Sequence, residues 1–427
     1  MKLFGSLSPL YRKVFYTLTS VILIFSHLNA DSTVTSDIYH LFYSGKYDSA
    51  IVALNMLKQE DPQNIEINTM LGDAYLKQQN WYDAIVCCEV IYQLQPKSKS
   101  NIFNYSTALQ KVGYSKRVEQ LLEEAFSADT SDISLMTMLA NFYYEEMNYA
   151  RSSQYFDKLL LVDETNTNTH LMAARCASKL KQSDRATQHY SLAYRYDPMS
   201  NKTVYEYARH LHSINRDLEA LELIGQHDLD LSNNQKFILL LGACLYSSGD
   251  YKQATTYLEQ AIAQQPKSVD LNKKLGFCYY VEKEYEKAYD RFLVIEPQED
   301  DPATYYYLGL CAREIGLDKA AIIYLTKSQS LIGPKYLAQL YLVLGQCHHD
   351  LKEYPQAIKS FKEALNVTPD DGVIYYSLAN TYNDFYADKS VALEYYKKAL
   401  EQDLSVEVES YIEQQILYLR KQTFFSE

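Results

Sequence analysis

Apolar residues recur at intervals of three and four along most of the chain, and short polar breaks interrupt them at regular places. In one such stretch, Ile238, Leu241 and Leu245 follow the helical interval. A polar break with a glycine follows at residues 247–250, and the helical interval resumes from Ala254. This pattern predicts a helix, a turn and a second helix, which together form a helical hairpin.

The hairpin pattern repeats with a period of 34 residues. Prolines in one register are separated by 34, 102 and 68 residues, which are one, three and two periods: Pro62, Pro96, Pro198 and Pro266. Proline has no amide hydrogen to donate, so it stops the second helix of a unit. We predict about eleven units, beginning near residues 31, 65, 99, 133, 167, 201, 235, 269, 302, 338 and 372.

Small residues also follow the period. Glycine stands at the eighth position of several units, as in Gly72, Gly242 and Gly276, and alanine stands at the twentieth, as in Ala84 and Ala254. We expect the two helices of a unit to approach closely at these positions, because a larger side chain would force them apart.

The pattern resembles the tetratricopeptide repeat. The unit from residue 65 carries its signature in Leu71-Gly72, Tyr75, Ala84 and Pro96, with Trp81 at the aromatic turn position. The resemblance covers residues 31–404, although the sixth unit lacks both the turn glycine and the closing proline. It implies an all-α fold, an alpha-alpha superhelix or solenoid of hairpins, and a role in binding other proteins.

The two ends of the chain differ from the repeats. Residues 1–30 have a basic start, an apolar stretch from Val14 to Leu28 and a small residue, Ala30, as a secretory signal peptide does. An uncleaved membrane anchor is the alternative. At the other end, residues 405–427 are predicted to form a capping helix and tail, since an array of repeats needs a final element with a polar outer face.

Composition narrows the class of partner. The net charge is −13, and removal of a leader that contains three basic and no acidic residues would make it −16. Nucleic acid is therefore an unsuitable partner, because phosphate binding needs a basic surface. The chain has 41 Tyr against 15 Phe and one Trp. Tyrosine suits half-buried helix faces and contact surfaces alike.

Five of the seven cysteines share the tenth position of their units, where Ala74 and Ala108 stand elsewhere: Cys176, Cys244, Cys278, Cys311 and Cys347. We expect a small buried site there, with cysteine acting as a slightly larger alanine. Units lie about 10 Å apart, whereas a disulfide needs Cα atoms within about 7 Å. All seven thiols are therefore predicted to be unpaired.

No catalytic motif is found, and we expect neither a metal site, a cofactor nor enzymatic activity. The run Cys347-His348-His349-Asp350 has ligand-type residues, but successive helical residues point about 100° apart and cannot converge on one ion.

Partner binding is expected on the first helices of the units. The resemblance places groove residues at positions two, five, nine and twelve. Units six to nine present aromatic and basic residues there: Lys202, Tyr205, Arg209, His212, Tyr246, Lys273, Phe277, Tyr280, Tyr306 and Arg313. Such residues dominate binding hot spots. The alternative interpretation is that the rings only pack against neighbouring first helices.

These observations favour a protein-binding scaffold or adaptor in the periplasm or another secretory compartment, which binds a protein or peptide segment with an acidic group. Two other hypotheses remain open. One is a membrane-held adaptor of an envelope-assembly or secretion machine, which contacts the membrane only through its leader. The other is a carbohydrate-binding protein, since aromatic groove residues also suit sugars.

Overall fold

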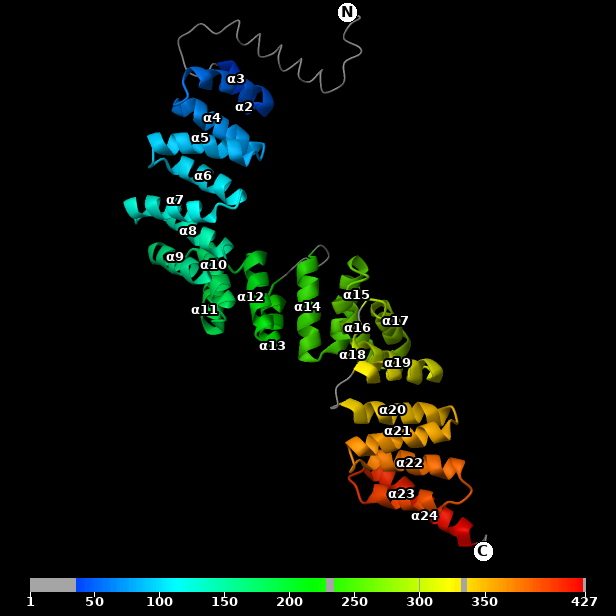
Figure 1. The fold of residues 1–427 in the computed structure, drawn as a ribbon. Coiled ribbons are helices and arrows are strands. Elements are labelled where there is room, and N and C mark those ends of the chain that lie inside the picture. The colour runs from blue at the N-terminus through cyan, green and yellow to red at the C-terminus, as the bar shows by residue number, and fades with distance from the viewer. Residues whose placement is uncertain (1–35, 228–233, 299, 332–335, 425–427) are drawn as a thin grey trace, which may run out of the picture. The chain divides into compact units, whose positions relative to one another are not determined.

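The computed structural model describes residues 36–227, 234–298, 300–331 and 336–424. The predicted signal peptide at residues 1–30 and the start of the first unit lie outside these residues. Every regular element in the described part of the chain is a helix, and the all-α prediction is confirmed (Figure 1). None of these helices is both long enough and apolar enough to cross a membrane.

The helices alternate between first and second members of hairpins. The first helices are α2 (Ser36–Tyr43), α4 (Ile65–Lys77), α6 (Lys99–Lys111), α8 (Ile133–Glu145), α10 (Thr167–Lys179), α12 (Asn201–Ser213), α14 (Gln235–Ser248), α16 (Val269–Val281), α18 (Pro302–Glu314), α20 (Leu337–Asp350) and α22 (Gly372–Phe385). The second helices are α3 (Tyr47–Glu60), α5 (Trp81–Leu94), α7 (Ser115–Ala128), α9 (Tyr149–Val162), α11 (Ser183–Tyr196), α13 (Asp217–Gly225), α15 (Tyr251–Gln264), α17 (Tyr285–Ile295), α19 (Asp318–Leu331), α21 (Tyr354–Val367) and α23 (Ser390–Leu400).

The chain divides into two compact units, residues 1–210 and 211–427. Within each unit, a first helix packs on the second helix of its own hairpin, and that second helix packs on the next first helix, as in α4, α5 and α6. Buried apolar side chains fill the space between successive helices in both units. The hairpins therefore form a solenoid, as predicted.

Glycine at the eighth position allows the close approach expected of it. A Cβ atom on Gly345 would lie 2.5 Å from Cε1 of Phe361, and one on Gly276 would lie 3.0 Å from Cζ of Phe292. Each phenylalanine lies on the second helix of the hairpin that contains its glycine, and both rings are buried. The opposing ring occupies the volume that a larger side chain would need.

Helix ends follow the sequence signals. Asn64, Asp132 and Asp371 cap first helices by accepting hydrogen bonds from backbone N–H groups of the first turn. Pro62 and Pro96 each stand two residues beyond the end of a second helix. These caps and stops separate one hairpin from the next.

The turn inside ten of the eleven hairpins uses a left-handed residue at the fifteenth position, whereas Tyr386 in the last hairpin does not. Glycine stands there in four units, at Gly45, Gly113, Gly249 and Gly316. In six others a residue with a side chain adopts φ of 59° to 62°: Gln79, Met147, Lys181, Asn215, Lys283 and Lys352. The left-handed conformation thus recurs whether or not glycine is available.

The last helix, α24 (Val406–Phe424), packs against α23. The predicted apolar stripe faces inward, because Ile412, Ile416 and Leu419 are buried and Val408 packs against the same cluster. The hydrophobic core therefore ends beneath this helix.

Candidate functional site

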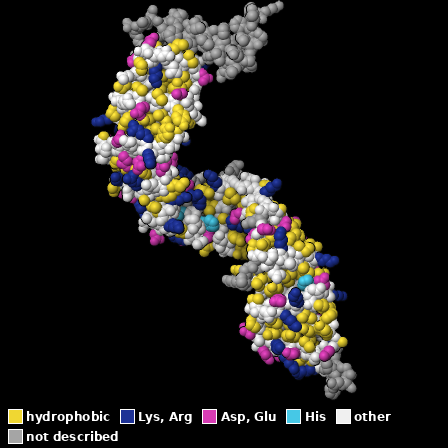
Figure 2. Space-filling view, in the orientation of Figure 1, with side chains coloured by type: hydrophobic (Ala, Val, Ile, Leu, Met, Phe, Trp, Pro, Cys, Tyr) yellow, Lys and Arg dark blue, Asp and Glu magenta, His cyan; other side chains and the backbone are white. Residues whose placement is uncertain are grey.

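The ten predicted groove residues all lie on the first helices α12, α14, α16 and α18. Lys202, Tyr205 and Arg209 belong to the unit formed by residues 1–210, and the other seven belong to the unit formed by residues 211–427. Figure 2 shows hydrophobic, basic and acidic side chains interspersed over the visible face of both units.

In residues 1–210, two arginines share one carboxylate. Nη2 of Arg175, on α10, lies 2.8 Å from Oε1 of Glu206, and Nη2 of Arg209 lies 2.9 Å from Oε2 of the same side chain. Burial opposes ionisation of Glu206, but its hydrogen bonds and the two guanidinium charges outweigh burial and lower the pKa of Glu206. The group therefore carries one net positive charge.

Two predicted residues flank this group. Lys202 donates a hydrogen bond to Oδ1 of Asn168 at 3.2 Å. The ring of Tyr205 lies 5.9 Å from the guanidinium carbon of Arg209, within reach of a cation–π contact.

In residues 211–427, the four predicted aromatic residues form a continuous row together with Tyr307. The ring of Phe277 lies 5.8 Å from that of Tyr246 and 5.4 Å from that of Tyr307, and Tyr280 lies 5.2 Å from Tyr307. We call Tyr246, Phe277, Tyr280, Tyr306 and Tyr307 the aromatic row. The rings touch neighbouring first helices, as the packing interpretation expects. They are half-buried, so part of each remains accessible.

A hollow of about 370 Å³ lies beside Tyr306, between the starts of α18 and α20. It is lined by Pro302, Ala303, Tyr306, Tyr307, Tyr336 and Gln339. Three tyrosines thus surround a space large enough for a side chain of a partner. Sequence reasoning missed Tyr307 and Tyr336, because Tyr307 stands at the sixth position and Tyr336 precedes its helix.

The predicted cations of this unit have acidic partners. Nζ of Lys273 lies 3.3 Å from Oδ2 of Asp301, and Arg313 lies 3.2 Å from Glu314 and 3.5 Å from Asp350. An acidic group of a partner would have to compete with these carboxylates.

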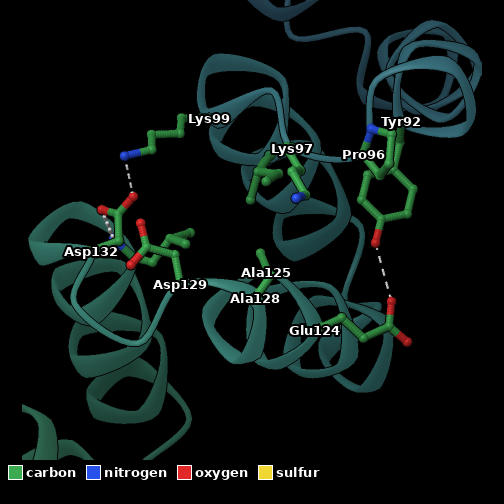
Figure 3. Close-up of a pocket in the computed structure, with 11 residues that line it drawn as sticks. Tyr92, Pro96, Lys97, Lys99, Glu124, Ala125, Ala128, Asp129 and Asp132 are labelled. Atoms are coloured by element: carbon green, nitrogen blue, oxygen red, sulfur yellow. Dashed lines mark hydrogen bonds and ion pairs between the residues drawn. The ribbon is translucent and has the colours of Figure 1, made fainter.

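Another hollow, of about 440 Å³, lies beside the loop that connects α5 to α6 and the loop that connects α7 to α8 (Figure 3). Its polar groups pair with one another. Lys99 forms an ion pair with Asp132, and the hydroxyl of Tyr92 donates to Glu124 at 3.1 Å. These contacts join neighbouring hairpins and leave the hollow without a convergent set of groups for chemistry.

Two family models of the tetratricopeptide repeat match the chain, at residues 245–313 and 338–371. The chain contains tetratricopeptide repeats. The matched segments cover α18 with Tyr306 and Arg313, and also α20 and α21. The predicted groove residues from Tyr246 to Arg313 lie within the first matched segment.

Known proteins with this repeat resemble the chain at low identity. A DnaJ homolog subfamily C member 7 homolog of Dictyostelium discoideum is 20% identical over 76% of this chain and 66% of its own length. The TPR repeat-containing protein YpiA of Bacillus subtilis is 24% identical over 42% of this chain and 43% of its own length. The chain thus spans less than two thirds of these relatives.

Solved structures with the same repeat also match. The C-terminal part of a TPR repeat-containing protein from Cytophaga hutchinsonii has a TM-score of 0.44 and 20% identity, over 56% of this chain and 98% of that one. YrrB, described as a TPR protein with an unusual peptide-binding site, has a TM-score of 0.37 and 18% identity, over 42% of this chain and 92% of its own.

The seven cysteines of this repeat protein are buried and unpaired, as predicted. The ligand-type run on α20 does not converge either. Nδ1 of His348 contacts Glu353 at 2.7 Å, whereas His349 contacts Thr381 and Asp384. Cys347 is fully buried. The two histidines of this run therefore contact different partners.

Proposed function

We propose that this tetratricopeptide-repeat protein is a non-enzymatic scaffold that binds a segment of a partner protein on its first helices. The observation that carries the proposal is the hollow beside Tyr306, because it adjoins the aromatic row and offers accessible rings from two successive first helices. Partly exposed tyrosine rings bury much area on binding at a low cost in side-chain entropy.

The partner segment has an apolar or aromatic residue for the hollow, and the partner also carries an acidic group. Support for the acidic group comes from residues 1–210, where Arg175 and Arg209 share the single carboxylate of Glu206. A carboxylate of the partner would balance the remaining positive charge.

The location we propose is the periplasm or another secretory compartment, with anchoring by residues 1–30 as the alternative. The apolar leader motivates this proposal. The mass of the N-terminal peptide from native cells tests it, since cleavage after Ala30 leaves Asp31 first. A mature protein that begins at Met1 and fractionates with soluble cytosolic proteins would contradict both locations.

Binding is tested with a photo-reactive residue in place of Tyr306 and, as a control, one in place of Ile323, which is 65% exposed on the second helix α19. The crosslinked partner is identified from native cells. We expect a single partner from Tyr306 and not from Ile323. Equal crosslinking of the same proteins at both positions would refute a specific site at the hollow.

Alanine variants then test the first helices of both units. The combined variant Tyr205→Ala, Arg209→Ala, Tyr280→Ala and Arg313→Ala should weaken capture of that partner by more than about tenfold, since each hot-spot residue contributes about 1–2 kcal/mol. Replacing exposed Tyr82 and Arg195, on second helices, provides the control. Undiminished capture by the groove variant, with helical circular dichroism retained, would refute the proposal.

A further inference from the structure

Three different metal-ligand groups meet beside the irregular sixth hairpin. His212 lies in the last turn of α12, Asp217 begins α13, and Cys244 lies in the middle of α14. One ligand atom from each, a ring nitrogen, a carboxylate oxygen and the sulfur, lies within 4.8 Å of the other two. No other such set of three is found among the described residues.

Asp217 is unusual for its position in the repeat because it is a buried acid. The seventeenth position carries an aromatic ring in Trp81, Tyr149, Tyr251 and Tyr285, serine in two units, and a less buried aspartate in Asp318. A carboxylate that is only 8% exposed is costly unless a cation or hydrogen-bond donors compensate it. The replacement of a ring by a buried acid therefore needs a local cause.

His212 supplies part of the compensation. Its Nδ1 lies 2.5 Å from Oδ1 of Asp217, and its side chain is 31% exposed. The ninth hairpin offers a comparison. It also has an aspartate at the seventeenth position, Asp318, but its twelfth position carries Arg313 where the sixth hairpin has His212. A guanidinium is always charged and cannot ligate a metal, whereas a neutral imidazole can.

We propose that His212, Asp217 and Cys244 bind a zinc ion through one nitrogen, one oxygen and one sulfur. Bond lengths of about 2.0–2.3 Å would place the ligand atoms about 3.3–3.8 Å apart in a tetrahedron. The three atoms lie within 4.8 Å of one another, so the side chains must adjust when the ion binds. Thiolate and imidazole ligands favour zinc over calcium or magnesium. A water molecule would complete the four ligands.

The ion would hold together three helices beside a short second helix. Helix α13 has 9 residues, whereas most second helices have 14, so it offers less surface for packing on its neighbours. Because zinc binds only the folded arrangement, it would raise the stability of this region in proportion to its affinity.

The test uses the full, untagged chain with zinc and with cobalt as a spectroscopic probe. We expect one tightly bound ion per chain after dialysis, thiolate-to-cobalt charge transfer in the absorption spectrum, and a melting temperature that rises with zinc. Cys244→Ala and Asp217→Tyr should each weaken binding by more than about tenfold and remove the zinc-dependent rise.

Both variants are compatible with folding, since other units carry alanine at the tenth position and an aromatic residue at the seventeenth. Cys278→Ala, at the tenth position of the next unit, is the matched control and should bind zinc as the unmodified chain does. The proposal is overturned if the unmodified chain retains no zinc. It is also overturned if Cys244→Ala and Asp217→Tyr bind zinc with the same affinity as the unmodified chain.

Discussion

Replacement of Gly345 by alanine should destabilise its hairpin, although alanine is the better helix former. The added Cβ would lie 2.5 Å from Cε1 and 2.6 Å from Cδ1 of Phe361. Phe361 is 1% exposed, so neighbouring side chains enclose its ring. The same substitution at Gly72 meets only ordinary contacts, 3.6 Å to Cβ of Cys87 and 3.7 Å to Sγ of Cys88.

The two substitutions should therefore have opposite signs. Alanine gains about 1 kcal/mol over glycine inside a helix. Overpacking of a buried contact costs about 1–3 kcal/mol. Gly72→Ala should stabilise its hairpin by about 1 kcal/mol, whereas Gly345→Ala should destabilise its hairpin by up to about 2 kcal/mol.

Native-state hydrogen exchange is the suitable assay, because a repeat array opens locally and a single unfolding free energy does not describe it. Amide protection should fall in α20 and α21 of Gly345→Ala and rise in α4 and α5 of Gly72→Ala. If Gly345→Ala protects its hairpin as much as Gly72→Ala does, the close-approach explanation of the eighth position is wrong.

Other predictions concern caps, charges and the array end. Asp132→Ala removes a cap that accepts from two backbone N–H groups and should lower the stability of α8 by about 0.5–2 kcal/mol, measured by native-state hydrogen exchange. Glu206→Gln leaves two arginines without their carboxylate and should cost about 1.5–3 kcal/mol. Folding lowers the pKa of Glu206, so the contribution of its ionised carboxylate to stability is complete above the ordinary glutamate pKa. This contribution is lost as the pH falls through the pKa of the folded state. Urea unfolding midpoints measured against pH, in the native chain and in Glu206→Gln, check this. Ile412→Ala, at a fully buried site under the last helix, should cost about 2–5 kcal/mol and reduce amide protection first in α23 and α24. Thiol titration of denatured, unreduced protein should find seven free groups.

Residue spacing predicted the fold because the same packing problem recurs in every unit. A small residue is needed wherever two helices cross, so Gly276 and its counterparts mark the period directly. The inward stripe of α24 was predictable for the same reason, since Ile412 and Ile416 follow the helical interval. Periodicity in the sequence therefore predicts the contacts that recur from one unit to the next.

The contents of the candidate sites were less predictable, because they depend on contacts between units. Arg175 and Glu206 are 31 residues apart in the chain and meet only because neighbouring first helices lie side by side. Asp217 and Cys244 likewise come from different hairpins. Asp217 departs from the aromatic residue that often stands at its position in the repeat. This departure was the signal that could have indicated the cluster of His212, Asp217 and Cys244.

The left-handed residue in ten of the hairpin turns has a consequence for how this protein responds to mutation. A side chain in that conformation costs about 1–2 kcal/mol relative to glycine, and six turns carry such a cost. Lys283 and Lys352 are thus sites where glycine would strengthen the protein without altering its packing. These six turns are therefore less stable than they could be. Natural selection does not remove such a cost once a protein is stable enough to function.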